Sequence, residues 1–365
     1  MTLSLYIARR FLGSVGMVFL IFFGILLLID MIEQLRRFSD AGVSMGTTLQ
    51  LALMNVPETL YRILPLIFVI GSVALFLALA RSSELVVVRA AGRSGLRFLA
   101  TPVFVSLVVG LLAVAVLNPI VAATSKAYED LRAGLSAGGQ SVLSVSDSGL
   151  WLRQGGDYGQ TVIEAARANL DGTELYDVTF LTFGPDGIPA SRYHAARARL
   201  SPGAWVVEGA KFWDLTAANP ELVSTDLPGE TRLPSDLTPE RIRDSFGTPS
   251  AVPVWDLPDH IEGLERAGFS ARAYRLWFQM ELAQPLLLTA MVLVAAGFTM
   301  RHARFGKTGM RVLYAILSGF ALFFLRNFAQ ALGESGQIPI ALAAWSPPVA
   351  AVMLALGLLL HLEDG

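Results

Sequence analysis

Two glycine-rich motifs in this chain resemble the sites of enzymes that act on nucleotides or esters. Gly306-Lys307-Thr308 matches the end of a phosphate-binding loop, but that loop needs a preceding strand and a glycine at position 301, which is Arg301 here. Gly134-Leu135-Ser136-Ala137-Gly138 matches the nucleophile elbow of hydrolases, in which the serine follows a strand and precedes a helix. Here a helical stretch comes first and a strand follows. Neither motif therefore predicts hydrolysis by this chain.

Residues that commonly ligate metals or attack substrates are few. The chain has no cysteine, which excludes disulfides, thiolate zinc sites, iron–sulfur clusters and a cysteine nucleophile. Its four histidines show no metal-binding spacing; they are His194, His260, His302 and His361. We therefore expect no catalytic residue, no metal and no cofactor in this chain.

One short charged segment is a stronger candidate for function. Residues 81–93 read R-S-S-E-L-V-V-V-R-A-A-G-R, in which Ser82 or Ser83 suits a helix N-cap, Glu84 the first turn and Gly92 the C′ position. The pattern predicts a two-turn helix that is apolar on one side and too short to cross a membrane. Such a helix either rests among lipid headgroups or docks in a groove of a soluble partner.

The elements around this segment are predicted to cross a membrane. Only 16% of the residues are charged and 53% are hydrophobic, whereas soluble domains carry about 25% charged residues. A helix needs roughly 20 apolar residues to span a bilayer. Six uncharged apolar runs approach that length and predict a polytopic α-helical membrane protein with six spans. The runs lie at residues 11–29, 63–80, 98–117, 282–300, 312–325 and 338–360. The fifth run is interrupted by Arg326 and is expected to continue to Leu332.

The loops between these runs differ sharply in charge. The N-terminal segment, the loops after the second and fourth runs and the C-terminal tail hold ten Lys and Arg against three acids. The positive-inside rule places these segments in the cytoplasm, with both termini. Residues 118–281 are then expected on the opposite side of the membrane.

The region 118–281 has the composition of a folded β-domain. It holds 22 acids and 14 Lys and Arg, a net charge of −8, which leaves +6 for the membrane part. Seven segments alternate or are rich in β-formers, at 140–146, 150–154, 160–165, 175–183, 190–201, 204–215 and 222–233. Short strands with Gly, Pro and Asp turns favour an all-β sandwich or jellyroll. Residues 238–246 and 256–267 are expected to be short helices or connectors.

The segment from Arg81 to Gly95 resembles a known signature. It matches the Ser-Glu-Leu-Val-Val-x-x-Ala-x-Gly pattern of the lipopolysaccharide-export permeases, the YjgP/YjgQ (LptF/LptG) family. The resemblance covers nearly the whole chain, through the basic start at 6–10, I-E-Q-L-R-R at 32–37, G-L-W at 149–151, Q-P at 284–285, G-M-R at 309–311, I-P at 338–339 and S-P-P at 346–348. The apolar Glu-Leu-Val-Val variant favours the LptG branch over LptF.

The resemblance implies a half-transporter of a Gram-negative inner membrane. Its parts would be spans one to three at 1–117 with the docking helix at 81–93, a periplasmic jellyroll at 118–281, and spans four to six at 282–365. It implies an LptF-type permease partner, an LptB-type ATPase dimer that binds ATP and Mg, a bitopic LptC-type protein and an LptA-type bridge. The implied function is extraction of lipopolysaccharide from the inner membrane for export, with no nucleic-acid partner and no catalysis by this chain.

Three sets of residues are candidates for these roles. Coupling to the ATPase is expected through Ser83, Glu84, Leu85, Val88 and Arg89. The anionic head of lipopolysaccharide is expected to meet basic residues near the periplasmic ends of the spans, namely Arg36, Arg37, Arg62, Lys126, Arg132 and Arg326. Of these, Arg62 and Arg326 are the sharper candidates, because a charge near membrane depth is costly. Acyl chains are expected in a β-domain groove lined by Leu150, Leu152, Phe180, Phe183, Trp205, Phe212 and Trp213, although core packing is the ordinary role of such residues.

Two other classes of protein are compared with this prediction. A mechanotransducing ABC permease would have four spans, with its large domain after the first. A membrane-bound acyl or glycosyl transferase would need a convergent acid–base or metal constellation, and the sequence contains none.

Overall fold

The chain folds into two compact units. The computed structural model describes residues 2–38, 44–82, 84, 95–135, 143–146, 149–156, 159–169, 172–184, 186–235, 237–239, 242, 248–266, 269–300 and 308–363. The membrane unit comprises Met1–Leu131, Ser250–Trp255 and Arg272–Gly365, and the β-unit comprises Arg132–Pro249 and Asp256–Ala271. Parts of the region 118–281 therefore belong to the membrane unit.

Six helices among the described residues are long and apolar enough to cross a membrane, which confirms the predicted number. They are α1 (Thr2–Arg37), α3 (Leu64–Arg81), α5 (Gly95–Leu112), α9 (Arg272–Thr299), α10 (Thr308–Glu334) and α11 (Ile340–Glu363). The third is the longest, because α5 continues through one π-helical turn, η2 (Ala113–Leu117), into α6 (Asn118–Leu135). The polytopic fold class is confirmed.

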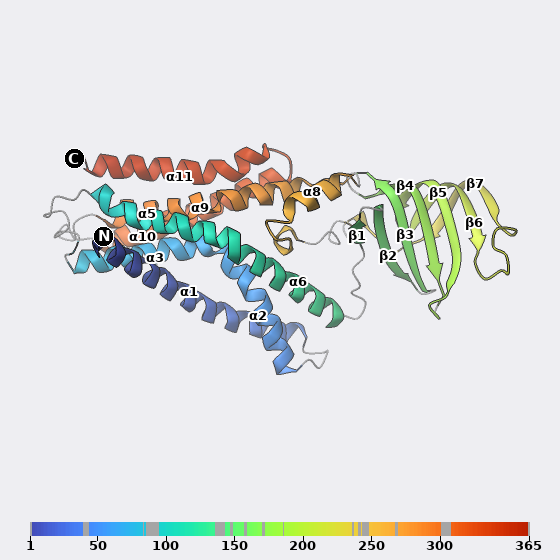
Figure 1. Ribbon diagram of the computed structural model, residues 1–365, viewed down its shortest axis with the longest axis horizontal. Coiled ribbons are helices and arrows are strands. Elements are labelled where there is room, and N and C mark those ends of the chain that lie inside the picture. The colour runs from blue at the N-terminus through green and yellow to red at the C-terminus, as the bar shows by residue number, and fades with distance from the viewer. Residues whose placement is uncertain are drawn as a thin grey trace. The chain divides into compact units, whose positions relative to one another are not determined.

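Helix α9 is the central helix of the membrane unit. It packs against α3, α5, α10 and α11 (Figure 1). Its apolar stretch is mostly buried, whereas that of α1 is mostly exposed. The α5–α9 interface brings two backbones together at Gly110, where an added Cβ would lie 2.6 Å from the Cα of Pro285. One turn away, the hydroxyls of Ser106 and Thr289 are 3.3 Å apart. Glycine is thus required at position 110 by close packing.

Helix α2 (Met45–Arg62) was not predicted from the sequence. Its N-terminus is capped by Ser44, whose Oγ accepts a hydrogen bond from the Thr47 N–H at 3.2 Å. Polar residues and Pro57 interrupt its apolar pattern, so it has no long uncharged run. The buried residues recur at helical spacing, and that period could have revealed it; they are Thr48, Leu51, Ala52, Val56, Leu60 and Tyr61.

The β-unit holds one seven-stranded antiparallel sheet among its described residues. The strands are β1 (Leu143–Ser146), β2 (Gly149–Gly156), β3 (Gly159–Ala168), β4 (Glu174–Phe183), β5 (Pro189–Ser201), β6 (Ala204–Asp214) and β7 (Thr225–Pro234). All seven predicted strands are present, and the inserted β-domain is confirmed. Each strand pairs with the next in sequence, so the described sheet is a meander of hairpins rather than the Greek-key order of a jellyroll.

The sheet curves so that distant strands meet (Figure 1). The Gln154 side chain on β2 donates to the Pro234 carbonyl at the end of β7 at 3.1 Å and accepts from the Ser235 hydroxyl at 2.7 Å. On the concave side, the Phe180 ring packs edge-on against Trp205 at 6.2 Å between centroids. Curvature therefore encloses an apolar inner face with a single sheet.

The strict alternation expected of a β-strand is broken at one point in β4. Alternation would put Leu175 and Val178 on opposite faces, yet both are fully buried. Asp177 between them has φ of 53°, and it lies exposed beside Tyr176 on the outer side. Two consecutive outward residues shift the phase of the strand, as a bulge does. The buried Ala195 and Ala198 on β5 are also three residues apart. The shift in phase is therefore present on the neighbouring strand as well.

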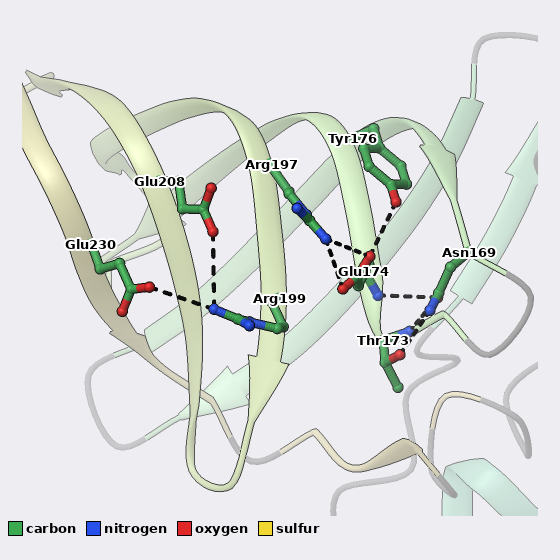
Figure 2. Close-up of polar contacts among 8 residues, drawn as sticks. All are labelled: Asn169, Thr173, Glu174, Tyr176, Arg197, Arg199, Glu208 and Glu230. Carbon is green, nitrogen blue, oxygen red and sulfur yellow. Dashed lines mark hydrogen bonds and ion pairs between the residues drawn. The ribbon is translucent and has the colours of Figure 1, made fainter.

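Charged side chains join the outer faces of β4 to β7 (Figure 2). Arg197 donates to both carboxylate oxygens of Glu174, at 3.0 and 2.9 Å, and Tyr176 donates to the same group at 3.1 Å. Arg199 lies 3.9 Å from Glu208 and 3.5 Å from Glu230. Asn169 supports the start of β4, because its Oδ1 accepts from the Thr173 and Glu174 N–H groups.

The charged contacts on the outer face predict that the β-unit loses stability in acid. The hydrogen bonds from Arg197 and Tyr176 hold the pKa of Glu174 below its ordinary value of 4.5. A lowered folded-state pKa stabilises above the unfolded pKa, and that contribution disappears as the pH falls through the folded pKa. We expect the thermal midpoint of the β-unit to fall less between pH 6 and pH 3 in Glu174→Gln than in the wild type. Equal falls in calorimetric scans of the two proteins would contradict this expectation.

Candidate functional site

The predicted docking segment is anchored to α1 through Glu84. Its carboxylate accepts hydrogen bonds from Arg10 at 2.8 Å, Ser82 at 2.9 Å and Tyr6 at 3.1 Å, and the Arg10 guanidinium lies 5.1 Å from the centre of the Tyr6 ring. Partial desolvation raises the pKa of Glu84, but the hydrogen bonds from Ser82 and Tyr6 and the Arg10 charge outweigh it, so the net pKa is lowered. The ionised carboxylate therefore joins the end of α3 to α1. The other predicted docking residues lie outside the described residues; they are Ser83, Leu85, Val88 and Arg89.

The basic candidates divide into exposed and buried groups. Arg62, at the end of α2, forms a 2.8 Å ion pair with Glu58 one turn earlier and is 64% exposed. Arg326 is only 8% exposed and lies inside the membrane unit. It is therefore not one of the exposed basic residues at the ends of the helices. The remaining candidates are exposed residues of α1 and α6, namely Arg36, Arg37, Lys126 and Arg132.

The helices that carry the exposed candidates are fixed to one another by polar contacts. Asn55 on α2 donates to Asp30 on α1 at 2.7 Å. Gln34 on α1 donates to the Tyr128 hydroxyl on α6 at 2.9 Å, and this contact is buried. Because Arg36 and Arg37 end α1, the two hydrogen bonds set the position of these cations relative to α2 and α6.

A buried polar cluster lies inside the membrane unit. It consists of Tyr61 on α2, Asn118 at the start of α6, Glu281 on α9 and Arg326 on α10. The Tyr61 hydroxyl and the Asn118 side chain hydrogen-bond to the Glu281 carboxylate, and Arg326 supplies the opposite charge. Asn118 and Glu281 are each 1% exposed. Four separate helices thus meet at one group of buried polar and charged side chains.

The members of the cluster lie at one depth. Asn118, Glu281 and Arg326 are each about 18 to 21 residues from the far ends of their spans, Arg97, Thr299 and Thr308. At 1.5 Å per residue this is roughly 30 Å, near the thickness of the hydrocarbon layer. Charges so placed face the bundle interior and pair with one another.

The sequence had indicated only one member of this cluster. Arg326 interrupts an apolar run and was predicted, whereas Glu281 was placed outside the fourth span because the uncharged run begins at Leu282. The structure begins that helix at Arg272. Tyr61 and Asn118 carry no sequence signal of their own. Among the residues that the structure describes, no three His, Asp or Glu side chains converge in a way that could hold a metal ion.

The predicted β-domain groove is divided between the two faces of the sheet. Leu150, Leu152, Phe180 and Trp205 are almost fully buried on the inner face. Phe212 is half-buried on the same face, with its ring 4.8 Å from that of Tyr193, across the β5–β6 pair.

Phe183 and Trp213 project from the outer face instead, because each follows an inward residue on its strand. Arg192 lies 5.1 Å and Lys211 lies 4.9 Å from the Trp213 ring, and the indole N–H donates to Glu221 at 2.7 Å. The geometry removes Phe183 and Trp213 from the predicted groove, and it adds Tyr193 to the inner face. Phase shifts along the strands explain why the sequence did not separate them.

Six candidate spans and a β-unit inserted between the third and the fourth fit a polytopic membrane permease rather than a four-span mechanotransducing permease. A family described as lipopolysaccharide export system permease LptF/LptG matches residues 5–361. The chain therefore belongs to the LptF/LptG family.

Curated relatives of this chain carry the LptG name. The lipopolysaccharide export system permease protein LptG of Escherichia coli K12 is 24% identical over 361 residues, which cover 98% of each chain. The protein of the same name from Haemophilus influenzae is 24% identical over 343 residues, which cover 92% of this chain and 91% of the relative. The similarity thus extends across both units.

Proposed function

We propose that this chain is an LptG-type permease subunit that takes lipopolysaccharide from the inner membrane and passes it towards a periplasmic bridge. The proposal rests on the match of one family across residues 5–361. The insertion of the β-unit between spans three and four supports it. The curated relatives named LptG support the choice of branch.

The proposed orientation places both termini in the cytoplasm. Ten Lys and Arg against three acids lie in the segments assigned to that side, and this bias sets the orientation of membrane proteins. The Glu84 anchor lies at that end and the Tyr61–Glu281 contact at the other. The β-unit is then periplasmic, where a lipid leaving the outer leaflet would meet it.

ATP hydrolysis is assigned to a partner, an LptB-type ATPase dimer that would bind ATP and Mg. The docking segment at 81–93 would receive the movement of that partner, and the Glu84 hydrogen bonds to Arg10 and Tyr6 would pass it to α1 as a rigid-body shift. An LptF-type permease, an LptC-type bitopic protein and an LptA-type bridge complete the proposed assembly.

The anionic and apolar parts of lipopolysaccharide have different proposed contacts. Arg36, Arg37, Arg62 and Lys126 are exposed at the outer ends of α1, α2 and α6, where phosphates would be attracted. The inner face of the β-unit offers apolar surface for acyl chains at Tyr193 and Phe212, which are only half-buried.

Photocrosslinking at two adjacent residues tests this proposal. A benzophenone side chain is placed at Phe212 on the inner face or at Trp213 on the outer face, in the intact complex in vesicles with lipopolysaccharide and ATP. We expect ATP-dependent crosslinks from position 212 that exceed those from position 213 by about tenfold, because neighbouring strand residues face opposite sides. A third probe at Ile32, an exposed residue of α1, reports entry into the membrane unit.

The matched pair makes the result decisive. Equal crosslinking from 212 and 213 would contradict the inner-face path, and absence of lipopolysaccharide from all three positions would contradict the proposed function. Vesicles without ATP serve as the control for adventitious lipid.

A further inference from the structure

A six-residue segment returns from the β-unit to the membrane unit before the last three spans begin. Ser250–Trp255 belongs to the membrane unit, whereas the chain up to Pro249 and from Asp256 to Ala271 belongs to the β-unit. We call Ser250–Trp255 the return segment. Helices α6 and α9 carry the chain between the units as ends of spanning helices. The return segment is the remaining crossing, and it is held by side-chain contacts.

Three hydrogen bonds attach the return segment to the helices. The Ser250 hydroxyl donates to Glu58 on α2 at 3.1 Å, the Val254 N–H donates to the Asn118 Oδ1 on α6 at 2.9 Å, and the Trp255 indole N–H donates to the Ala115 carbonyl at 3.2 Å. Ser250 and Val254 are buried, at 8% and 3% exposure. A connector with no structural role would not be fixed at both of its ends.

The attachment point on the third span is irregular in a specific way. Ala115 lies in the π-helical turn η2, and Asn118 directly follows it. A π-turn displaces carbonyls from the regular α-helical ladder, and such turns are frequent at functional sites. Here one of those carbonyls accepts the Trp255 indole. The irregular turn and the return segment therefore form one structure.

The same attachment leads directly to the buried polar cluster. Asn118 accepts from Val254 with its carbonyl oxygen, and its side chain also hydrogen-bonds to Glu281 on α9. Glu58 on α2 accepts from Ser250 and also from Ser125 on α6. A displacement of α2 or α9 relative to α6 therefore pulls on the return segment through one intervening side chain.

We propose that the return segment is the mechanical link by which movement of the spanning helices repositions the β-unit to receive lipopolysaccharide. Glu58 and Asn118 are positioning residues in this step, since they act on the return segment and not on the substrate. The proposal rests on the proposed function. Extraction of lipid into the membrane unit does not need the link, whereas transfer to the β-unit does.

The test separates extraction from transfer in the intact complex. Ser250→Ala combined with Trp255→Phe removes the Ser250–Glu58 and Trp255–Ala115 hydrogen bonds while keeping most of each side chain. With probes at Ile32 and Phe212, we expect unchanged crosslinking of lipopolysaccharide at 32, unchanged ATP hydrolysis, and about fivefold less crosslinking at 212. A fivefold change corresponds to about 1 kcal/mol, the usual net strength of one or two such bonds. Ser250→Thr keeps the hydroxyl, so its crosslinking at 212 is expected to match that of the wild type.

Each outcome bears on the proposal. Equal 212-to-32 crosslinking ratios in the wild type and the double variant would overturn the link. Parallel loss at 32 and 212 would also overturn it, because the contacts would then serve only the stability of the membrane unit. The single variant Trp255→Phe, whose side chain is 65% exposed, guards against misfolding. Absence of lipopolysaccharide at both probes in the wild type would instead contradict the proposed function.

Discussion

Replacing Arg326 by methionine is expected to destabilise the membrane unit by about 1–3 kcal/mol, because the buried Glu281 carboxylate loses the nearby opposite charge. The Glu281 carboxylate would remain buried without its opposite charge, with only Tyr61 and Asn118 as hydrogen-bond partners. Thermal unfolding of the purified chain in detergent, followed by tryptophan fluorescence, measures the change. The midpoint should fall well below that of the wild type.

The double variant Glu281→Gln with Arg326→Met distinguishes charge pairing from packing. It removes both charges, so we expect it to be more stable than either single variant, with a coupling energy of at least about 1 kcal/mol. Arg62→Met is the matched control, since its ion pair with Glu58 is largely exposed and should contribute less than about 1 kcal/mol. Strict additivity of the two buried changes would show that the cluster is not an energetic unit.

Gly110→Ala is expected to separate α5 from α9. The new methyl group would lie 2.6 Å from the Pro285 Cα and 3.0 Å from its Cβ, and backbone atoms cannot rotate away. Overpacking costs about 1–3 kcal/mol where side chains can adjust, and occasionally more, so this backbone contact should reach the upper end. The Ser106–Thr289 hydroxyl contact across the same interface would lengthen as the helices part.

The control for this change is Gly357→Ala on α11. Position 357 has no heavy atom within 4 Å of an added Cβ, and alanine favours helix over glycine by about 1 kcal/mol. The thermal midpoint should therefore fall for position 110 and stay level or rise for position 357. If the two alanine variants unfolded at the same temperature, the close α5–α9 approach would not be a determinant of stability.

The spans and strands were predictable because their physical requirements are local. A helix in hydrocarbon needs about 20 residues without charge, and six such runs are visible in the sequence. Strands need alternation over a few residues, which identified all seven. Helix α2 was missed since its polar half interrupts the run, and simple alternation does not describe β4 because Asp177 shifts the phase of the strand.

The candidate site was predictable only in part. Glu84 and Arg326 stand out as charges beside apolar runs; Glu84 joins two helices by hydrogen bonds, and Arg326 is buried near Glu281. Their partners could not be inferred, because Arg10 and Glu281 are distant in sequence and meet them only after the helices pack. Trp213 was assigned to the groove with Phe212, although neighbouring strand residues face opposite ways.

The sequence by itself determined a six-span membrane protein with an inserted β-domain, and its motif pointed to the LptF/LptG family. These properties depend on composition and period within single segments. Only the tertiary structure decided that Asn118 joins Val254 to Glu281, and that the return segment is fixed to a π-helical turn. The physical reason is that hydrogen bonds and ion pairs inside a membrane protein form between segments that packing brings together, and burial makes them strong only once that packing exists.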